Sequence, residues 1–581
     1  MKKPFICLSL AAMAFAAMPA EAQFAKLKDK MTTGGSAKSK SDGFTTVWES
    51  EFENKANVLS VVNNEGEMIL GTSDNQATML DATGKTMWNG KYKALSTNGV
   101  SDADFQFSVW GANALFVFDK KMGKDKVTVL NMKTGKEMWN TDAYADLSDD
   151  NVEYISEMDA FLFSLKNSLV MVKAKTGEKV WETSKFKGAI GSYLFLKDKN
   201  ELIMVNFKPT ALGALFTGFK NQFVRINAAN GEVKWDATFA GMVEKEIITR
   251  KPLVKLSKVD DKVFLQLNGL QVFDYNSGQK LWAAVYETDE AGRKGFGSGT
   301  MASAIYGAIA DPLVDNNSVY LVLGGDKAKI KFIEKHDLLT GKLLWISEKI
   351  KDATAMPHIY LSNGRVVAQV GGYVNLQKKT KDKQPDGSIV IHYTSEWVFQ
   401  GKFGILALDD NDGKASWRSE KFDKRITDLV FDGASVFAAG GDEFYSYDIK
   451  SGKQNYSINH SDAKVGKSMW AFDLGEDVAI VCDRGIAAYN KATGKRKYAS
   501  DKVKDVDAYH MVGKNFFLRD QRNNKNKLIA VDLATGDTKG EVVSKGVGGG
   551  GSYGDGFDIS SDGEYIFAFK GKSVEKLKVN P

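Results

Sequence analysis

Short runs of alternating apolar and polar residues fill most of this chain. The first clear set is Val58–Val62, Glu67–Gly71 and Gln76–Leu80, followed after a glycine turn by Lys85–Trp88. Alternation over this length is typical of half-buried β-strands, and four such runs separated by turns predict a four-stranded antiparallel sheet. The chain has only 8 prolines in 581 residues and no long amphipathic helix pattern. We therefore predict an all-β protein.

A repeat motif separates these runs and recurs about ten times. It reads Asp or Asn, two variable residues, a small turn residue, Gly, three more residues and usually an aromatic; the first copy, Asp81–Trp88, is one residue shorter. Glycine accepts a positive φ at little cost, and Asp or Asn bonds back to the backbone, so each motif predicts a tight hairpin turn. Successive glycines are most often about 42 residues apart, which is the period of four-stranded propeller blades. The turn glycines are Gly84, Gly135, Gly177, Gly231, Gly278, Gly341, Gly413, Gly452, Gly494 and Gly536.

Most copies of the motif place an aromatic residue four positions after the turn glycine. On the outermost strand of a blade, such a ring can cover the adjoining turn and seal one blade to its neighbour. We therefore predict a packing role for these residues, in preference to cofactor stacking. The tenth copy has Gly540 at this position, and two late copies have tyrosine, so we expect looser packing there. The predicted repeat aromatics are Trp48, Trp88, Trp139, Trp181, Trp235, Trp282, Trp345, Trp417, Tyr456 and Tyr498.

The two termini each supply part of one further unit. Thr45–Ser50 reads as an outer strand with no blade before it, while Tyr565–Phe569 and Val574–Lys578 read as inner strands with no outer strand after them. Pairing these segments would remove an exposed sheet edge. We predict a β-propeller over residues 44–581, with about eleven four-stranded units, closed by its N- and C-terminal strands. Since propellers typically have about four to eight blades, two smaller propellers remain the alternative.

Two copies of the motif, Ala407–Trp417 and Ala530–Gly536, resemble the tryptophan-docking repeat of pyrroloquinoline-quinone-type propellers. That family includes the quinoprotein alcohol dehydrogenases and a non-catalytic propeller lipoprotein that assists outer-membrane protein assembly. The resemblance covers essentially residues 44–581 and implies the fold. It does not by itself separate enzymes from scaffolds, because the motif is a blade-packing device.

Cysteine content favours the non-catalytic member of this family. Quinoprotein alcohol dehydrogenases hold their quinone beneath a ring of adjacent disulfide-bonded cysteines, whereas an exported form of this chain would retain only Cys482. Related sugar-oxidising enzymes lack the ring, so a dehydrogenase that uses pyrroloquinoline quinone (PQQ) and calcium remains the alternative. No calcium ligands or catalytic Asp can be carried over residue by residue. We predict no cofactor, no catalytic residue and no metal site, and a core position for Cys482 in Val478–Cys482.

Other catalytic patterns are weak. The 5 histidines show no zinc-site spacing. Asp409–Gly413 resembles a calcium loop, but it falls on a repeat turn and Leu408 stands at the first ligand position. Gly546–Ser552 lacks the Lys-Ser/Thr of a phosphate loop. Lys and Arg total 78 against 73 Asp and Glu, a balance that does not favour nucleic-acid binding.

The N-terminus predicts export. Lys2 and Lys3 precede an apolar run over Phe5–Met18, and Ala20 and Ala22 are the small residues that a signal peptidase recognises. We predict a signal peptide over residues 1–22, cleaved near Ala22–Gln23, a flexible leader over residues 23–43, and a periplasmic or secreted protein. No later run reaches the length of a transmembrane span.

Three insertions interrupt the repeat: Phe207–Gln222, Ala284–Ala304 and Gly372–Gln400. Loops held by a rigid scaffold usually carry the binding residues, so we expect a partner-binding face there; the other interpretation is that the insertions plug the channel of a large ring. We predict a protein-binding scaffold of an envelope or outer-membrane complex, active in outer-membrane protein assembly or secretion; a glycan-binding propeller is a further alternative. The candidate partner-binding residues are Phe216, Phe219, Arg293, Phe296, Tyr306, Lys378, Lys379 and Trp397.

Overall fold

The computed structural model describes residues 41–580, with gaps at 54–55, 62–65, 73–74, 101–104, 120–125, 145–146, 148–150, 166, 208–218, 242–253, 268, 286–301, 307, 325–328, 384–388, 423–424, 504–505, 507, 514, 521–525, 545–555 and 570–571. Only the backbone is described for residues 41–42, 56–61, 72, 105–106, 302–306, 375–383, 389–397, 520 and 526. The predicted signal peptide and most of the predicted leader lie outside the described residues.

The described chain is built from eleven antiparallel sheets, nine of four strands and two of five. Each sheet is a propeller blade whose strands follow one another in sequence, apart from β1, β2 and β23, which join blades distant in the chain. The predicted fold class, an all-β propeller of about eleven four-stranded blades, is confirmed. The blades fall into two compact units, which are described separately: Met1–Asp236, Ala508–Val531 and Thr538–Pro581 form unit 1, and Ala237–Asp507 with Asp532–Asp537 form unit 2.

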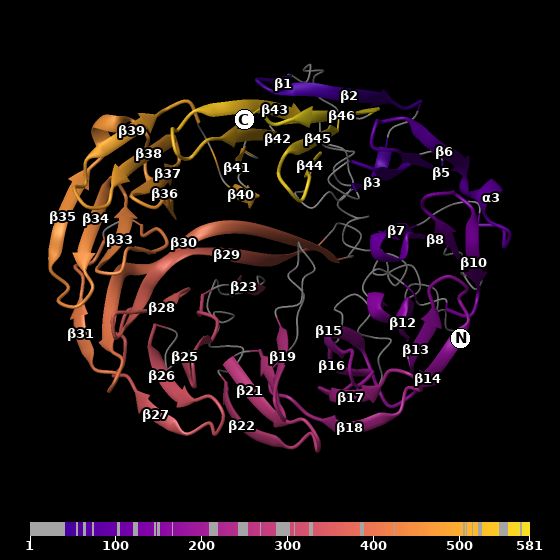
Figure 1. The fold of residues 1–581 in the computed structure, drawn as a ribbon, viewed down its shortest axis with the longest axis horizontal. Coiled ribbons are helices and arrows are strands. Elements are labelled where there is room, and N and C mark those ends of the chain that lie inside the picture. Colours follow the sequence, from indigo (N-terminus) through magenta and orange to yellow (C-terminus); the bar gives the residue numbers. More distant parts are fainter. Residues whose placement is uncertain are drawn as a thin grey trace, which may run out of the picture. The chain divides into compact units, whose positions relative to one another are not determined.

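Unit 1 contains six blades, drawn from indigo to magenta and in yellow in Figure 1. Their strands, blade by blade, are β3 (Ala56–Val61), β4 (Met68–Thr72), β5 (Gln76–Leu80) and β6 (Thr86–Lys91); β7 (Phe105–Val109), β8 (Ala114–Asp119), β9 (Lys126–Asn131) and β10 (Glu137–Thr141); β11 (Val152–Ile155), β12 (Ala160–Ser164), β13 (Leu169–Lys173) and β14 (Lys179–Thr183); β15 (Ala189–Leu196), β16 (Glu201–Phe207), β17 (Phe223–Asn227) and β18 (Val233–Ala237); β40 (Ala508–Val512), β41 (Asn515–Asp520), β42 (Asn526–Val531) and β43 (Thr538–Ser544), with β1 (Ser41–Asp42) at the edge; and β44 (Phe557–Ile559), β45 (Tyr565–Phe569) and β46 (Ser573–Lys578), completed by β2 (Thr45–Glu51).

Unit 2 contains five blades. Their strands are β19 (Lys255–Val259), β20 (Lys262–Gln266), β21 (Gly269–Asp274) and β22 (Lys280–Val285); β24 (Leu313–Asp315), β25 (Ser318–Gly324), β26 (Lys331–Asp337) and β27 (Leu343–Ile346); β28 (Ile359–Ser362), β29 (Arg365–Lys383), β30 (Ile389–Asp409) and β31 (Ala415–Arg418), with β23 (Ala302–Tyr306) added to β29; β32 (Val430–Phe431), β33 (Ser435–Gly440), β34 (Glu443–Asp448) and β35 (Gln454–Asn459); and β36 (Ser468–Asp473), β37 (Asp477–Cys482), β38 (Gly485–Asn490) and β39 (Arg496–Ser500).

Helix is almost absent from the described residues. The helical segments are α3 (Tyr92–Leu95) and the 3-10 turns η1 (Trp110–Ala112), η2 (Ser156–Met158) and η4 (Ser461–Ala463). No helix in this part of the chain is long and apolar enough to cross a membrane.

The predicted pairing of the two termini is confirmed. Strand β2 runs antiparallel to β46, with Thr45 opposite Lys578 and Glu51 opposite Ser573. The Thr46 hydroxyl donates to Glu575 over 2.7 Å across the same pair. β1 pairs with β43, so the described chain begins within the segment predicted as a leader over residues 23–43.

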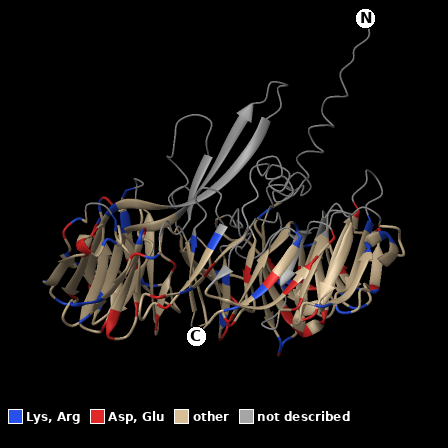
Figure 2. Cartoon of the chain, turned by 90° about the horizontal axis from the view of Figure 1, so that it is seen from above, with Lys and Arg blue, Asp and Glu red and all other residues tan. Residues whose placement is uncertain are grey.

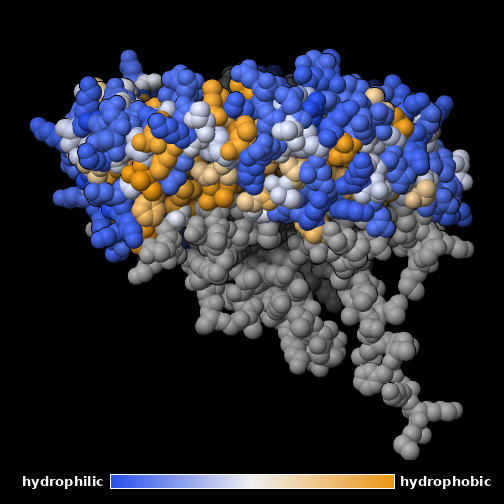
Figure 3. Space-filling view, turned by 90° about the horizontal axis from the view of Figure 1, so that it is seen from below, coloured by the Kyte–Doolittle hydropathy of each residue, from blue (hydrophilic) through white to orange (hydrophobic). Residues whose placement is uncertain are grey.

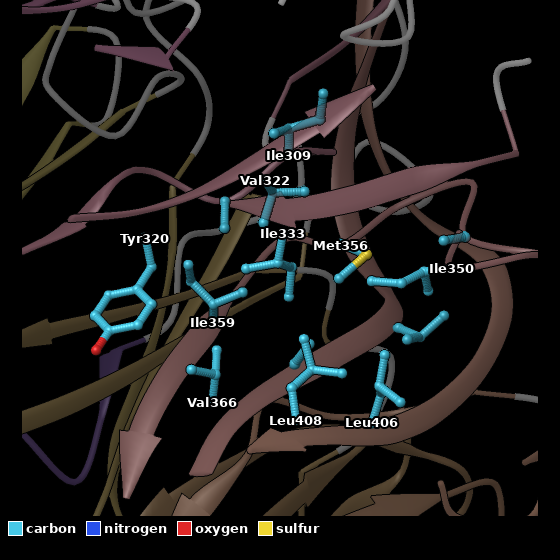
Figure 4. Close-up of a cluster of buried hydrophobic side chains, with 14 of the residues drawn as sticks. Ile309, Tyr320, Val322, Ile333, Ile350, Met356, Ile359, Val366, Leu406 and Leu408 are labelled. Carbon is cyan, nitrogen blue, oxygen red and sulfur yellow. The ribbon is translucent and has the colours of Figure 1, made fainter. Parts of the chain in front are cut away.

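Apolar side chains between neighbouring blades form the core. In unit 2, one cluster joins the blade of β24–β27 to the blade of β28–β31, as Figure 4 shows. It includes Ile333, Met356 and Val366, which are completely buried, and Trp345, which is also buried. Each Å² of apolar surface buried between two blades stabilises the folded state by about 25 cal/mol. This burial holds one blade against the next.

Candidate functional site

Six of the repeat tryptophans lie at blade junctions and make two contacts each. Trp88 packs on the turn glycine of the next blade, where a Cβ added to Gly135 would lie 2.6 Å from the indole ring. Its Nε1 donates to the carbonyl of Met132 in the same turn, over 2.7 Å. The turn glycine has a φ of +67°, so both its conformation and the ring above it require glycine. Equivalent Nε1 bonds join Trp48 to Ala82, Trp139 to Ala174, Trp181 to Ala228, Trp345 to Asp410 and Trp417 to Ile449.

The two tyrosines keep both contacts. The Tyr456 hydroxyl donates to the Lys491 carbonyl over 2.7 Å, and the Tyr498 hydroxyl donates to the Leu533 carbonyl. Each ring also lies on the turn glycine of the next blade. The looser packing that we expected at these junctions does not show in these contacts.

At Gly540 the aromatic and the glycine have exchanged places. A Cβ on Gly540 would lie 2.6 Å from the ring of Phe44. Phe44 stands four residues before Trp48, which is the position of the turn glycine in other units. The closing blade is made from both termini and has no turn between β46 and β2, so a tryptophan at residue 540 would have no turn to cover. At this position Asn580 Nδ2 instead donates a hydrogen bond to the Gly43 carbonyl.

Trp282 departs from the pattern. Its ring packs on Gly341, but its Nε1 has no hydrogen-bond partner among the described residues. It stacks instead on His336, with ring centroids 5.7 Å apart and planes 10° apart. Both His336 nitrogens face acceptors, Glu334 Oε2 at 2.8 Å and the Gly341 carbonyl at 3.0 Å. Burial lowers the pKa of His336, but these two hydrogen bonds outweigh burial and the net pKa is raised.

Two of the three insertions combine into one sheet. Strands β29 and β30 have 19 and 21 residues and stay paired from Arg365 opposite Asp409 to Lys383 opposite Ile389. β23, from the second insertion, pairs with the same stretch of β29 (Figure 1). We call the part of this sheet formed by Ala302–Tyr306, 375–383 and 389–397 the hairpin extension.

Four of the predicted partner-binding residues belong to the hairpin extension. Lys378 and Lys379 lie opposite Ser303 and Ala302. Tyr306 lies opposite Asn375, which lies opposite Trp397, so the two aromatic positions share one cross-strand row. The sequence placed these residues in separate loops, and the structure brings them into one sheet.

The base of the extension is firmly packed into unit 2. Val374 and Ala355 are 1% and 0% exposed, in a cluster that also includes Val398. The rings of Tyr373 and Phe399 lie 4.9 Å apart. A bulge in β30, where Gly401–Phe403 lie between the partners of Val370 and Gly372, bends the hairpin at this point. These contacts hold the extension on a rigid support.

The other predicted partner-binding residues do not belong to the hairpin extension. Phe219, from the first insertion, is half-buried, and its ring lies 2.8 Å from a Cβ built on Gly188, so it packs within its own blade. The ends of that insertion are tied by Asn206, which donates to the Lys220 carbonyl over 2.8 Å and accepts from the Gln222 N–H over 2.8 Å. Phe216, Arg293 and Phe296 lie outside the described residues.

Each carboxylate of the acidic turn Asp409–Gly413 forms an ion pair with a different basic side chain. Asp409 pairs with Arg365 at 2.6 Å, Asp410 with Lys335 at 2.9 Å, and Asp412 with Lys414 at 2.8 Å. The backbone N–H of Asn411 lowers the pKa of Asp409, and the Lys414 hydrogen bond lowers the pKa of Asp412. Basic and acidic residues are interspersed along the blades of each unit in the same way (Figure 2). Within the described ranges, no group of three or more His, Cys, Asp or Glu side chains could hold a metal ion.

A small polar cluster lies inside unit 2. Ser468 Oγ is 3.4 Å from His460 Nε2, and both residues are buried, as is Cys482 on the neighbouring strand. Burial lowers the pKa of His460 and raises the pKa of the Cys482 thiol, so both stay neutral. The predicted core position of Cys482 is confirmed. These buried groups offer no open surface to a substrate.

Comparison with known proteins identifies the family. The model of outer membrane protein assembly factor BamB matches residues 37–200, 123–305 and 401–553. The chain belongs to the BamB family. The predicted resemblance to the assembly propeller of this family is therefore confirmed. No curated protein sequence matches the chain.

Solved structures similar to this BamB-family chain include BamB from Moraxella catarrhalis, at 12% identity and a TM-score of 0.27, covering 68% of this chain and 94% of that chain. The computationally designed Ika8 protein matches at 14% identity and a TM-score of 0.32, covering 69% and 99%. A eukaryotic initiation factor matches at 9% identity and a TM-score of 0.33, covering 73% and 95%. Similarities of this size carry no argument about function.

Proposed function

We propose that this chain is an exported, non-catalytic scaffold that binds a polypeptide partner in an envelope complex for outer-membrane protein assembly. Membership of the BamB family supports this proposal. The signal pattern over residues 1–22 supports export, with a periplasmic or secreted mature chain. No cofactor takes part in the proposed function.

The hairpin extension is the observation that carries the proposal. Beyond the blade, β30 continues as far as Ile389 and pairs with β29 along its whole length. On the other side of β30, pairing with β31 ends at Leu406, and the bridge of Phe403 to Phe422 follows. From Ile389 to Lys402, no described strand pairs with this second edge of β30.

An open strand edge of this length can accept another strand. Main-chain N–H and C=O groups then supply affinity, and side chains at alternate positions supply selectivity. Natural proteins usually protect such edges, because unprotected edges cause aggregation. We infer that an extended segment of the partner adds to β30, next to the row that holds Tyr306, Asn375 and Trp397.

Shortening the extension tests the proposal. Residues 377–395 are replaced by Asn-Gly, a two-residue hairpin turn that links Leu376 to Glu396. The packed base, with Val374 and Val398, is left in place. In cells that carry the chain, its loss should lower the amounts of assembled outer-membrane proteins, the full chain should restore them, and the shortened chain should not. Normal assembly without the chain would overturn the assembly role.

A matched variant separates backbone pairing from charge. Lys378→Ser with Lys379→Ser keeps the strand but removes two positive charges. Because exposed charges mainly steer association, this variant should bind the partner with slower association and with most of its affinity retained. Retained binding by the shortened chain would place the partner elsewhere on the propeller, even if the assembly role holds. Thermal midpoints of both variants check that the blades still fold.

A further inference from the structure

Strand β27, the outer strand of its blade in unit 2, exposes an apolar surface. Leu343, Leu344 and Ile346 are 46%, 47% and 48% exposed, and Leu339 in the preceding turn is 38% exposed. Trp345, between them, is buried and covers the Gly413 turn. Figure 3 views the molecule from the side on which β22 and β27 lie in Figure 1, and it shows apolar residues grouped at the surface there. Exposed apolar groups of this kind mark sites of association.

The composition of β27 is unusual within the repeat. Other outer strands carry polar residues at one or more of the three positions around the repeat aromatic, as in Lys179, Val180 and Glu182 around Trp181. Only in β27 are all three of these positions apolar. Trp345 already makes the contact between blades, so blade packing does not require the three exposed residues.

β27 also presents a sheet edge. It is the last strand of the sheet β24-β25-β26-β27, and in the described part of the chain no strand pairs with its outer side. The segment after it stays on the same edge, because the Ser347 N–H donates to the Ile333 carbonyl over 2.9 Å and Ile350 bridges to Lys331. An apolar edge strand without protection is a template for a further strand.

We propose that the occupant of this edge is β27 of a second copy of the chain, paired antiparallel about Trp345. In this register, Leu344 lies opposite Ile346 of the second copy, and Lys342 lies opposite Glu348. Lys342 and Glu348 are both exposed. A twofold axis repeats each contact, so two apolar pairs and two opposite-charge pairs form at once. The segment Lys342–Glu348 is therefore complementary to itself in the antiparallel direction.

The expected association is weak. A strand of 4 residues offers a contact smaller than those of permanent dimers, which bury far larger areas. Dimer formation should therefore depend on protein concentration. This inference concerns a different edge from the hairpin extension and does not rest on the proposed function.

Sedimentation velocity over a series of concentrations tests the proposal. As the concentration increases, the apparent mass of the wild-type protein should rise from that of one chain to that of two. Leu344→Lys should remain one chain at all concentrations. The control is Val180→Lys, because Val180 precedes Trp181 in the same way and is 40% exposed. This control should dimerise like the wild type, and its failure to do so would overturn the proposal, as would a wild type that stays single.

The charge pair gives a second test that does not disturb the apolar surface. Lys342→Glu places like charges opposite each other twice and should raise the dissociation constant roughly two- to thirty-fold. Adding Glu348→Lys to this variant reverses both charges and should restore wild-type dimerisation. If the double variant dissociates as readily as Lys342→Glu alone, the proposed register is wrong.

Discussion

The junction of Phe44 and Gly540 offers the sharpest test of how the propeller closes. At other junctions a tryptophan or tyrosine covers a turn glycine, whereas here the glycine lies on β43 and the ring comes from the N-terminal segment. The perturbations are Gly540→Ala, Phe44→Ala and the two together. The double variant matters because the structure predicts that the two changes do not add.

The magnitudes follow from the geometry. A Cβ added at Gly540 would lie 2.6 Å and 2.7 Å from two carbons of the Phe44 ring, inside van der Waals contact. Overpacking of this kind costs about 1–3 kcal/mol. Phe44 is half-buried, so Phe44→Ala should cost about 2 kcal/mol, less than for a fully buried ring. With the ring removed, the methyl group that Gly540→Ala introduces meets no clash, so the double variant should cost about 1–3 kcal/mol less than the sum.

Hydrogen exchange measures these costs at the junction itself. Amides of β43 and β2 should exchange about five-fold faster for each kcal/mol lost, since both strands meet there. Amides of β12, in another blade of unit 1, serve as the control and should not change. Simple additivity of the two substitutions, or equal acceleration in β12, would refute the exchange of positions between ring and glycine.

Four further predictions follow from the same contacts. Trp181→Ala should destabilise unit 1 by roughly 3–5 kcal/mol, because the ring is buried and bonded to Ala228, and by more than Tyr456→Ala destabilises unit 2; equal costs in chemical denaturation would contradict this. Because folding raises the pKa of His336, the protonated side chain stabilises the folded protein. This stabilisation is fully present below the pKa of about 6.5 that His336 has in the unfolded chain, and it is lost as the pH rises through the pKa in the folded protein. Melting curves against pH should therefore differ between the wild type and His336→Gln at low pH and converge at high pH. Deletion of residues 44–52 should remove exchange protection from residues 565–578, and unchanged protection there would disprove the pairing of β2 with β46. Adding PQQ with calcium to the protein should change neither the absorbance of the quinone nor the thermal midpoint of the protein. A rise of several degrees in the thermal midpoint would support the dehydrogenase alternative.

Local chemistry explains why so much of the fold could be predicted from the sequence. A turn such as Asp81–Gly84 closes through its own atoms, with Asp81 Oδ1 accepting the Thr83 N–H over 2.8 Å and the Lys85 N–H over 3.0 Å. Because each unit repeats this turn at nearly constant spacing, strand number, turn positions and the role of the aromatics were all predictable. The pairing of the termini was predictable too, because each end lacked what the other supplied.

The tertiary structure decided where segments from different units meet. Pairing of β23 with β29, which places Tyr306 in the row of Asn375 and Trp397, joins residues about 70 to 90 positions apart, and nothing in either segment specifies this register alone. The same holds for Phe44 over Gly540, which the sequence showed only as a departure from the repeat. Local turns depend on residues a few positions apart, whereas these contacts depend on backbone positions that exist only once neighbouring blades have packed. The repeat in the sequence therefore determined the blades, and packing between blades determined the surfaces that we propose for binding.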